Sequence, residues 1–143
     1  MAWRIYQWAG RYRQVNLSKG AFPFASAGRI PDLMENFEKG HLRRFTPCLF
    51  STQPEVVRAL AVVHTEMVLI HPFREGNGRL ARMLAIVMAV QAGLPPLDFG
   101  HLQGRKKQEY FLAVRTGMKY DYGLMEEIFT GVIERSLKRR GQS

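Results

Sequence analysis

One short segment of the chain, residues 71–82, gathers side chains that could do chemistry. Its sequence is His71-Pro72-Phe73-Arg74-Glu75-Gly76-Asn77-Gly78-Arg79-Leu80-Ala81-Arg82. An imidazole has an ordinary pKa near neutrality, which suits a general base. A carboxylate, a glycine-rich turn and two guanidiniums suit a metal ion bound to a polyphosphate. These residue types therefore predict a site that binds a metal–polyphosphate and takes a proton from an incoming hydroxyl.

Helices are predicted on both sides of this segment. Over residues 54–70, apolar residues recur with helical spacing, at Val56, Val57, Leu60, Val63, Met67 and Ile70. Pro54 suits the first turn of this helix. Pro72 ends the helix because proline lacks an amide donor and restricts the residue before it. Residues 79–92 are apolar on nearly all sides, so we expect this second helix to be central to the fold.

The glycine-rich turn opens the second helix. Gly76-Asn77-Gly78 can adopt positive φ and direct backbone N–H groups inward. A helix N-terminus adds unpaired N–H groups and a partial positive charge, and the two together bind anions. Arg79 and Arg82 are three residues apart, so both guanidiniums lie on one face of the first turn. We expect the turn and both arginines to bind the same anion.

The same segment carries a family resemblance. It matches, at all eight specified positions, the pattern H-x-F-x-[D/E]-G-N-G-R-x-x-R, and the chain therefore resembles the Fic family. Residues 8–20 resemble the family's approach to a β-hairpin called the flap, and residues 110–137 resemble its closing helices.

The resemblance implies an all-α Fic fold, a helical bundle around the helix–loop–helix of residues 54–70 and 79–92. A short β-hairpin flap is expected at about residues 19–30. Residues 1–143 are expected to form a single Fic domain. The family's usual first helix is expected to be missing or cut short, because only seven residues precede Trp8.

The resemblance also implies roles for individual residues. His71 would be the general base, Glu75 would hold Mg²⁺, and Tyr110 would line the adenine pocket. The phosphates of ATP would contact the turn, including the Asn77 side chain, and the two arginines: Gly76, Asn77, Gly78, Arg79 and Arg82. The flap would hold a segment of the target by main-chain pairing, through Lys19, Gly20, Ala21, Phe22, Pro23 and Phe24.

The implied activity is transfer of AMP from ATP to a Ser, Thr or Tyr hydroxyl of a target protein. Family members of the Doc type carry Ala-Asn-Lys in place of Gly76-Asn77-Gly78 and transfer a terminal phosphate instead, so this chain has the adenylyl-transfer form. Another nucleotide, phosphocholine transfer or removal of AMP are alternatives on the same fold. A catalytically silent binding module is a further alternative.

The family's inhibitory motif, [S/T]-x-x-x-E-[G/N], is absent from the chain. Residues 51–55 and 130–134 fit its first five positions, but valine and arginine follow them. In inhibited family members the glutamate docks on the arginine that corresponds to Arg82. We therefore expect inhibition by a small antitoxin-type protein in trans or by a segment upstream of Met1.

Composition limits the other functions that the protein could have. The chain has 143 residues, enough for one domain, and a net charge of +9. Basic residues are scattered apart from runs at 105–107 and 138–140, so direct nucleic-acid binding is a minor alternative. The single cysteine, Cys48, excludes an internal disulfide, and no His/Cys spacing suggests zinc. No signal peptide or membrane-spanning run is visible, so a cytoplasmic protein is expected, with delivery into another cell left open.

The rest of the chain predicts further helices. Residues 31–37 are expected to form a short helix that Gly40 ends. The last two helices are expected at residues 104–116 and 124–140. Of the other histidines, His64 is expected in the core behind the site, whereas His41 and His101 follow glycines and are expected in loops.

Overall fold

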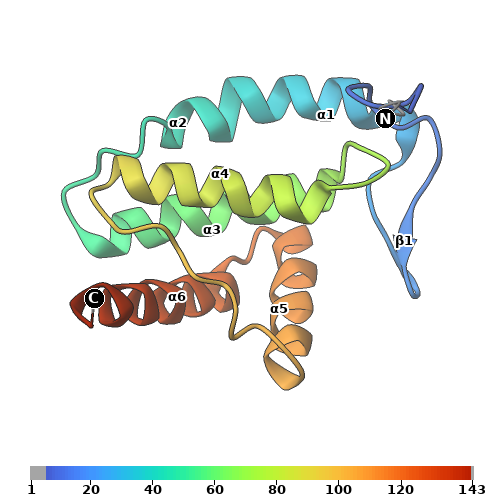
Figure 1. Ribbon diagram of the computed structural model, residues 1–143. Coiled ribbons are helices and arrows are strands. Elements are labelled where there is room, and N and C mark those ends of the chain that lie inside the picture. Colours follow the sequence, from blue (N-terminus) through green and yellow to red (C-terminus); the bar gives the residue numbers. More distant parts are fainter. Residues whose placement is uncertain (1–5, 143) are drawn as a thin grey trace, which may run out of the picture.

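Two adjacent helices, α3 and α4, form the centre of the molecule (Figure 1). The computed structural model describes residues 6–142. Helix α3 spans Gln53–Ile70 and helix α4 spans Asn77–Gln91. The predicted helices at 54–70 and 79–92 are therefore confirmed to within two residues. The expected loss of the family's first helix concerns residues before Trp8, and residues 1–5 lie outside the described residues.

Helix α3 is fixed at its start by a capping box. The Thr52 hydroxyl accepts a hydrogen bond from the Glu55 N–H at 3.4 Å, and the Glu55 carboxylate accepts one from the Thr52 N–H at 3.0 Å. Pro54 occupies the first turn, where its missing amide hydrogen costs nothing. Because α3 contacts α1, α4, α5 and α6, most of its residues are buried.

Helix α4 is central but buries only one of its faces. Its buried residues face α3 and include Ala81, Ala85, Met88 and Ala89. The opposite face is exposed, with Leu80, Met83, Val87 and Val90 between 38% and 58% exposed. This face is exposed because α3 is the only helix of the described chain that packs against α4.

A long, continuous helical segment runs along a side of α3 that α4 does not cover. Helix α1, Ile30–Phe37, continues through a π-helical turn, Glu38–Leu42, into α2, Arg43–Phe45. Gly40 therefore does not end the helix, and His41 lies in a helix rather than in a loop. The Arg43 N–H donates to the Glu38 carbonyl, five residues back, so the π turn absorbs an extra residue without breaking the helix.

The last two helices close the bundle. Helix α5 spans Arg105–Thr116 and helix α6 spans Gly123–Gly141, within one residue of the predicted bounds. Two short 3₁₀ turns, Ala27–Arg29 and Gly117–Lys119, precede α1 and follow α5. Figure 1 shows α6 running beside α3 while α5 stands across its end. No helix of the described residues is long and apolar enough to cross a membrane.

The flap is a β-hairpin, as expected, but a shorter one. Strand β1, Ser18–Lys19, pairs antiparallel with β2, Phe22–Pro23, around a turn in which Gly20 has φ +58°. The predicted range of 19–30 is too long because a 3₁₀ turn begins at Ala27 and α1 at Ile30. The Asn16 side chain accepts from the Ala27 N–H at 2.8 Å, which joins the two ends of the hairpin segment.

Close packing at Gly117 yields a stability prediction. A Cβ at this position would lie 2.2 Å from Thr65 Cγ2 in the buried face of α3. We expect Gly117→Ala to lower the free energy of unfolding by about 1–3 kcal/mol because the core must shift. Urea unfolding followed by circular dichroism measures it. Gly131→Ala in α6, where a Cβ meets nothing within 4 Å, is the control and should be neutral or stabilising. Equal stability of the two variants would contradict the prediction.

Candidate active site

His71 sits at the junction between α3 and the loop that leads to α4. It ends α3 in the left-handed conformation, with φ 52° and ψ 60°, and its N–H donates to the Met67 carbonyl at 3.0 Å. Positive φ is uncommon for a residue with a side chain, and such strain gathers at functional sites. The turn directs the chain sharply away from α3 and exposes the imidazole to one side of the bundle.

A buried arginine, Arg13, holds this junction in place. It is only 2% exposed. Its guanidinium donates to the carbonyls of Ile70 at 3.2 Å and His71 at 2.6 Å, and also to those of Val15 at 2.8 Å and Ala25 at 2.5 Å. One side chain therefore ties the end of α3 to both ends of the flap segment. Apart from the position of Arg13 ahead of the flap, nothing in the sequence indicates this role.

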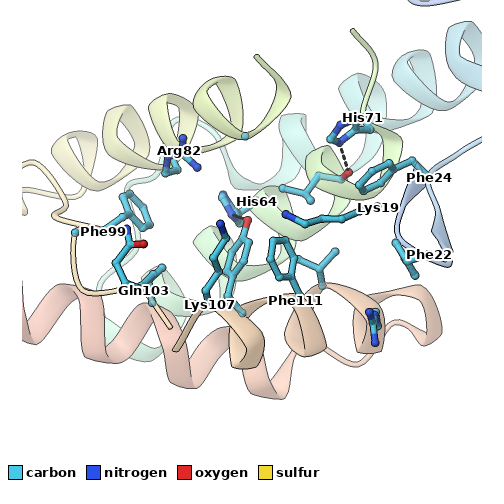
Figure 2. A pocket seen from close by; sticks show the side chains of 17 residues that line it. Lys19, Phe22, Phe24, His64, His71, Arg82, Phe99, Gln103, Lys107 and Phe111 are labelled. Atoms are coloured by element: carbon cyan, nitrogen blue, oxygen red, sulfur yellow. Dashed lines mark hydrogen bonds between the residues drawn. The ribbon is translucent and has the colours of Figure 1, made fainter. Parts of the chain in front are cut away.

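The His71 ring is fixed in a defined tautomer. It stacks on Phe24 of the flap segment, with ring centroids 3.7 Å apart and an interplanar angle of 6°. Its Nδ1 lies 3.3 Å from the Val68 carbonyl (Figure 2). Because a carbonyl oxygen only accepts, Nδ1 carries the proton and Nε2 keeps a free lone pair. Burial lowers the pKa of His71, and the charges of Arg13 and Lys19 lower it further. The ring is thus neutral at pH 7.

This lowered pKa predicts the pH dependence of any reaction that uses His71 as a base. The rate requires the neutral ring, so it should be constant near neutrality and fall as the pH drops through the His71 pKa, below 6.5. A pH profile of kcat/KM measures it. In Lys19→Met the acid limb should move to higher pH, because a nearby positive charge is lost. An acid limb centred above 6.5 in the unmodified protein would contradict the prediction.

Asn77 shapes the loop between α3 and α4. Its side chain accepts from the Phe73 N–H at 2.8 Å and donates to the Phe73 carbonyl at 2.7 Å. It is 3% exposed. Both ends of the side-chain amide thus bind the loop backbone. The bond pair closes residues 73–77 into a fixed turn ahead of α4.

The first turn of α4 offers backbone donors to a ligand. Gly76 precedes the helix with φ 83° and supplies no side-chain cap, so N–H groups of the first turn have no partner within the helix. A Cβ on Gly78 would lie 3.2 Å from Arg82 Nη1. A side chain there would compete with the guanidinium for space. Glycine at this position thus leaves room for Arg82 beside the open amides.

These residues open into a cavity of about 690 Å³. Figure 2 shows His71 and Arg82 above it, with Lys107 and Phe111 of α5 rising from below. The cavity brings together seven of the residues expected from the sequence: Lys19, Phe22, Phe24, His71, Gly78, Arg82 and Tyr110. Seven others do not line it: Gly20, Ala21, Pro23, Glu75, Gly76, Asn77 and Arg79.

Arg79 and Glu75 lie outside the cavity for a geometric reason. Both are exposed. The Arg79 guanidinium folds back over the turn, 3.5 Å from where a Cβ on Gly76 would be. In this arrangement the Arg82 side chain lines the cavity and that of Arg79 does not. Glu75 makes no hydrogen bond or ion pair with the described residues, so both carboxylate oxygens are open to solvent.

The far wall of the cavity was largely missed from the sequence. It comes from one face of α5, at Lys107, Phe111, Val114 and Arg115, and from the loop at residues 99–103. The spacing of the α5 residues, together with Tyr110, is that of a single helix face, which was available as a signal. Its orientation toward the flap was not, because sequence periodicity does not say which neighbour a face meets.

Tyr110 is held by His64 at the bottom of the cavity. The His64 Nδ1–H donates to the Ala81 carbonyl at 3.2 Å, so Nε2 accepts from the Tyr110 hydroxyl at 2.7 Å. Burial lowers the pKa of His64 to about 4 and raises the pKa of Tyr110 to about 12, so both stay neutral at pH 7. The expected place of His64, in the core behind the site, agrees with the structure, where it is 1% exposed.

The flap is attached to α5 by two cation–π contacts. Lys19 Nζ lies 3.7 Å from the centre of the Phe111 ring, and Arg115 lies 5.8 Å from that of Phe22. Such contacts contribute roughly 0.5–2 kcal/mol each. Together with the stacking of Phe24 on His71, they hold the hairpin across the cavity.

Comparison with known proteins identifies the family. The family model described as the Fic/DOC family matches residues 2–89, more than half of the chain. The chain belongs to the Fic/DOC family. The probable protein adenylyltransferase Fic of Escherichia coli K12 is 30% identical over 134 residues, which are 90% of this chain and 62% of that protein. The protein adenylyltransferase Fic of Nematostella vectensis is 37% identical over 92 residues, 62% of this chain and 20% of that protein.

Solved structures show the same Fic fold. BepC, a VirB-translocated effector of Bartonella tribocorum solved with bound AMPPNP, is 24% identical with a TM-score of 0.68, over 89% of this chain and 66% of that one. Residues 134–508 of Fic-1 from Caenorhabditis elegans are 24% identical with a TM-score of 0.65, over 92% of this chain and 36% of that one. At these identities the likeness concerns the fold alone.

Proposed function

We propose that this Fic/DOC domain transfers AMP from ATP to a Ser, Thr or Tyr hydroxyl of a target protein, in a Mg²⁺-dependent reaction. One observation carries the proposal. His71, whose Nε2 keeps a free lone pair, lines a cavity that Gly78 and Arg82 in the first turns of α4 also line. A base and an anion site thus share one cavity. The names of its adenylyltransferase relatives support the same reaction.

In the proposed reaction, His71 Nε2 takes the proton of the target hydroxyl. The hydroxyl oxygen then forms a bond to the α-phosphorus of ATP, and the bond from that phosphorus to the bridging oxygen of pyrophosphate breaks. AMP stays on the target and pyrophosphate leaves. The backbone N–H groups of the first turn of α4 and the Arg82 guanidinium stabilise negative charge on the phosphate oxygens.

The residues present fit a magnesium ion with few protein ligands. Glu75 is exposed on the loop beside Gly76 and has open carboxylate oxygens. Mg²⁺ commonly binds one or two carboxylates together with substrate phosphates and water. Among residues 6–142 no cluster of three or more His, Cys, Asp or Glu could hold a metal ion by itself. Glu75 would therefore hold Mg²⁺ jointly with ATP, and the ion would neutralise phosphate charge.

The nucleotide and the target would lie on different sides of the flap. Tyr110 and Phe111 line the part of the cavity where adenine would lie, and the AMPPNP bound to the related BepC supports ATP as the substrate. The target segment would pair with strand β1 of the flap, on the edge that does not pair with β2, beside Lys19 and Gly20. Inhibition would come from an antitoxin-type protein or an upstream segment that places a carboxylate on Arg82.

The position of the label distinguishes this reaction from its alternatives. The domain is incubated with Mg²⁺, a cell lysate and ATP labelled at either the α- or the γ-phosphate. Protein labelled from α-ATP and not from γ-ATP supports AMP transfer. Label from γ-ATP alone indicates phosphate transfer, as in the Doc type. ATP binding with no label from either donor indicates a silent binding module. Each of the last two outcomes overturns the proposal.

A further inference from the structure

The cavity carries more positive charge than one phosphate site explains. Four cationic side chains line it, Lys19, Arg82, Lys107 and Arg115, and no Asp or Glu among the described residues does. None of the four forms an ion pair with a carboxylate in residues 6–142. Unpaired cations gathered in one cavity are a binding surface for negative charge.

These cations belong to two different walls. Arg82 comes from α4, beside Gly78 and the open amides, whereas Lys107 rises from α5 and Lys19 extends from the flap (Figure 2). The side chain of Lys19 lies between those of His71 and Lys107 in this view. The first wall provides the site proposed for the 5′-phosphates. The second wall is a separate source of positive charge.

The two lysines are held near each other despite their like charge. Lys19 Nζ is fixed over the Phe111 ring at 3.7 Å. Both lysines line the same cavity (Figure 2), and burial and the charge of Lys107 lower the pKa of Lys19. Two cations that repel one another are stabilised by an anion bound between them.

The start of α5 also carries an excess of positive charge. Its first turn contains Arg105, Lys106 and Lys107, and it has neither an acidic residue nor a side-chain cap at Gly104. Cations are unfavourable at the positive end of a helix dipole. Lys106 is balanced by Glu109 at 3.3 Å, but Lys107 has no such partner and faces the cavity. This local cost is consistent with a function for the Lys107 charge.

Aromatic side chains line the same cavity. Tyr110, Phe111 and Phe99 line the cavity beside the lysines and offer ring faces to a nucleobase and its sugar. With the 5′-phosphates at α4, the part of a nucleotide that meets the lysines is the nucleoside. A negative group on the nucleoside of a nucleotide is a phosphate on a ribose hydroxyl.

We propose that Lys19 and Lys107 form a second anion subsite, which binds a phosphate monoester on the 2′- or 3′-hydroxyl of the nucleotide ribose. The inference rests on the proposed function in one respect, since it takes the occupant of the cavity to be a nucleotide with its 5′-phosphates at α4. Nucleotides with a ribose phosphate would then bind more tightly than those without, and would compete with ATP.

Calorimetric titration without Mg²⁺ tests the subsite. The domain is titrated with AMP, adenosine 3′,5′-bisphosphate and adenosine 2′,5′-bisphosphate, which differ only in the ribose phosphate. At least one bisphosphate should bind about tenfold more tightly than AMP, as expected for charge-assisted hydrogen bonds to one phosphate. Lys107→Met and Lys19→Met should each reduce this preference to about threefold or less. Lys106→Met, on the same turn but outside this cavity, should keep it.

Several outcomes overturn the subsite. Equal affinities for AMP and both bisphosphates would do so, as would an unchanged preference in a Lys107→Met variant with a native circular dichroism spectrum. Titration of the AMP complex with inorganic phosphate distinguishes a free anion from a ribose phosphate. If inorganic phosphate binds to the AMP complex with a free energy equal to the gain from AMP to a bisphosphate, the site binds a free anion and the ribose-phosphate assignment is wrong. If neither AMP nor ATP binds at all, the proposed function itself fails, which separates the two failures.

Discussion

Replacing His71 with alanine is expected to lower the rate of AMP transfer by roughly 100- to 10,000-fold, the usual contribution of a general base. ATP affinity should stay within about threefold of the unmodified protein, because the phosphates are proposed to contact α4 rather than the imidazole. The reason lies in the fixed tautomer, in which Nδ1 binds the Val68 carbonyl and Nε2 is left free to take a proton. Label incorporation from α-labelled ATP measures the rate, and calorimetry measures the affinity.

Two further variants separate chemistry from structure at this position. His71 has φ 52°, and asparagine tolerates this conformation better than alanine does, so His71→Asn should be equally inactive but closer to native stability. His41→Ala removes a histidine from the π-helical turn between α1 and α2 and should leave the rate unchanged. Transfer by His71→Asn at a near-native rate would show that the imidazole is not the base.

The largest expected effect on stability comes from Arg13→Met. The substitution keeps much of the aliphatic stem but leaves four backbone carbonyls without their donor, those of Val15, Ala25, Ile70 and His71. Unsatisfied buried groups of this kind are costly, and we expect the free energy of unfolding to fall by about 3–5 kcal/mol. Because Arg13 joins the flap segment to the end of α3, hydrogen exchange should also become faster in residues 15–25. Guanidinium unfolding gives the stability.

Arg11→Met is the matched control for this prediction. Arg11 is exposed and two residues away, and its replacement should change the free energy of unfolding by no more than about 0.5 kcal/mol. Arg13→Lys should be intermediate, because one ammonium cannot reach the carbonyls that a guanidinium fork reaches. If Arg13→Met and Arg11→Met are equally stable, Arg13 does not hold the junction.

Local sequence determined the elements that carry the site. The apolar spacing of residues 54–70, Pro54 and Thr52 together define α3, and the capping box follows from residue types three positions apart. Gly76 and Gly78 determine the turn into α4. Gly76 adopts a positive φ that favours glycine, and Gly78 leaves room for the Arg82 guanidinium. These features depend on neighbours in the chain, so the sequence by itself contains them.

Where local signals conflict with packing, the sequence was a poorer guide. Gly40 predicted a helix end, yet the chain continues through a π turn because both sides of that turn pack along the same path beside α3. The apolar composition of α4 predicted a central helix but not that one face has no helix against it in the described chain. Composition reports which residues are apolar, but not which faces meet.

The tertiary structure alone decided how the site is assembled. Arg13 lies 58 residues from His71 in sequence, and the bond between them exists only because the flap segment crosses the end of α3. The same crossing brings Phe24 onto the imidazole and Lys19 onto Phe111 of α5. Contacts between segments so far apart depend on the whole arrangement of helices. The sequence by itself therefore determined the proposed base and the glycine-rich turn beside it, while the fold decided the tautomer of that base, the cavity and the charges that surround it.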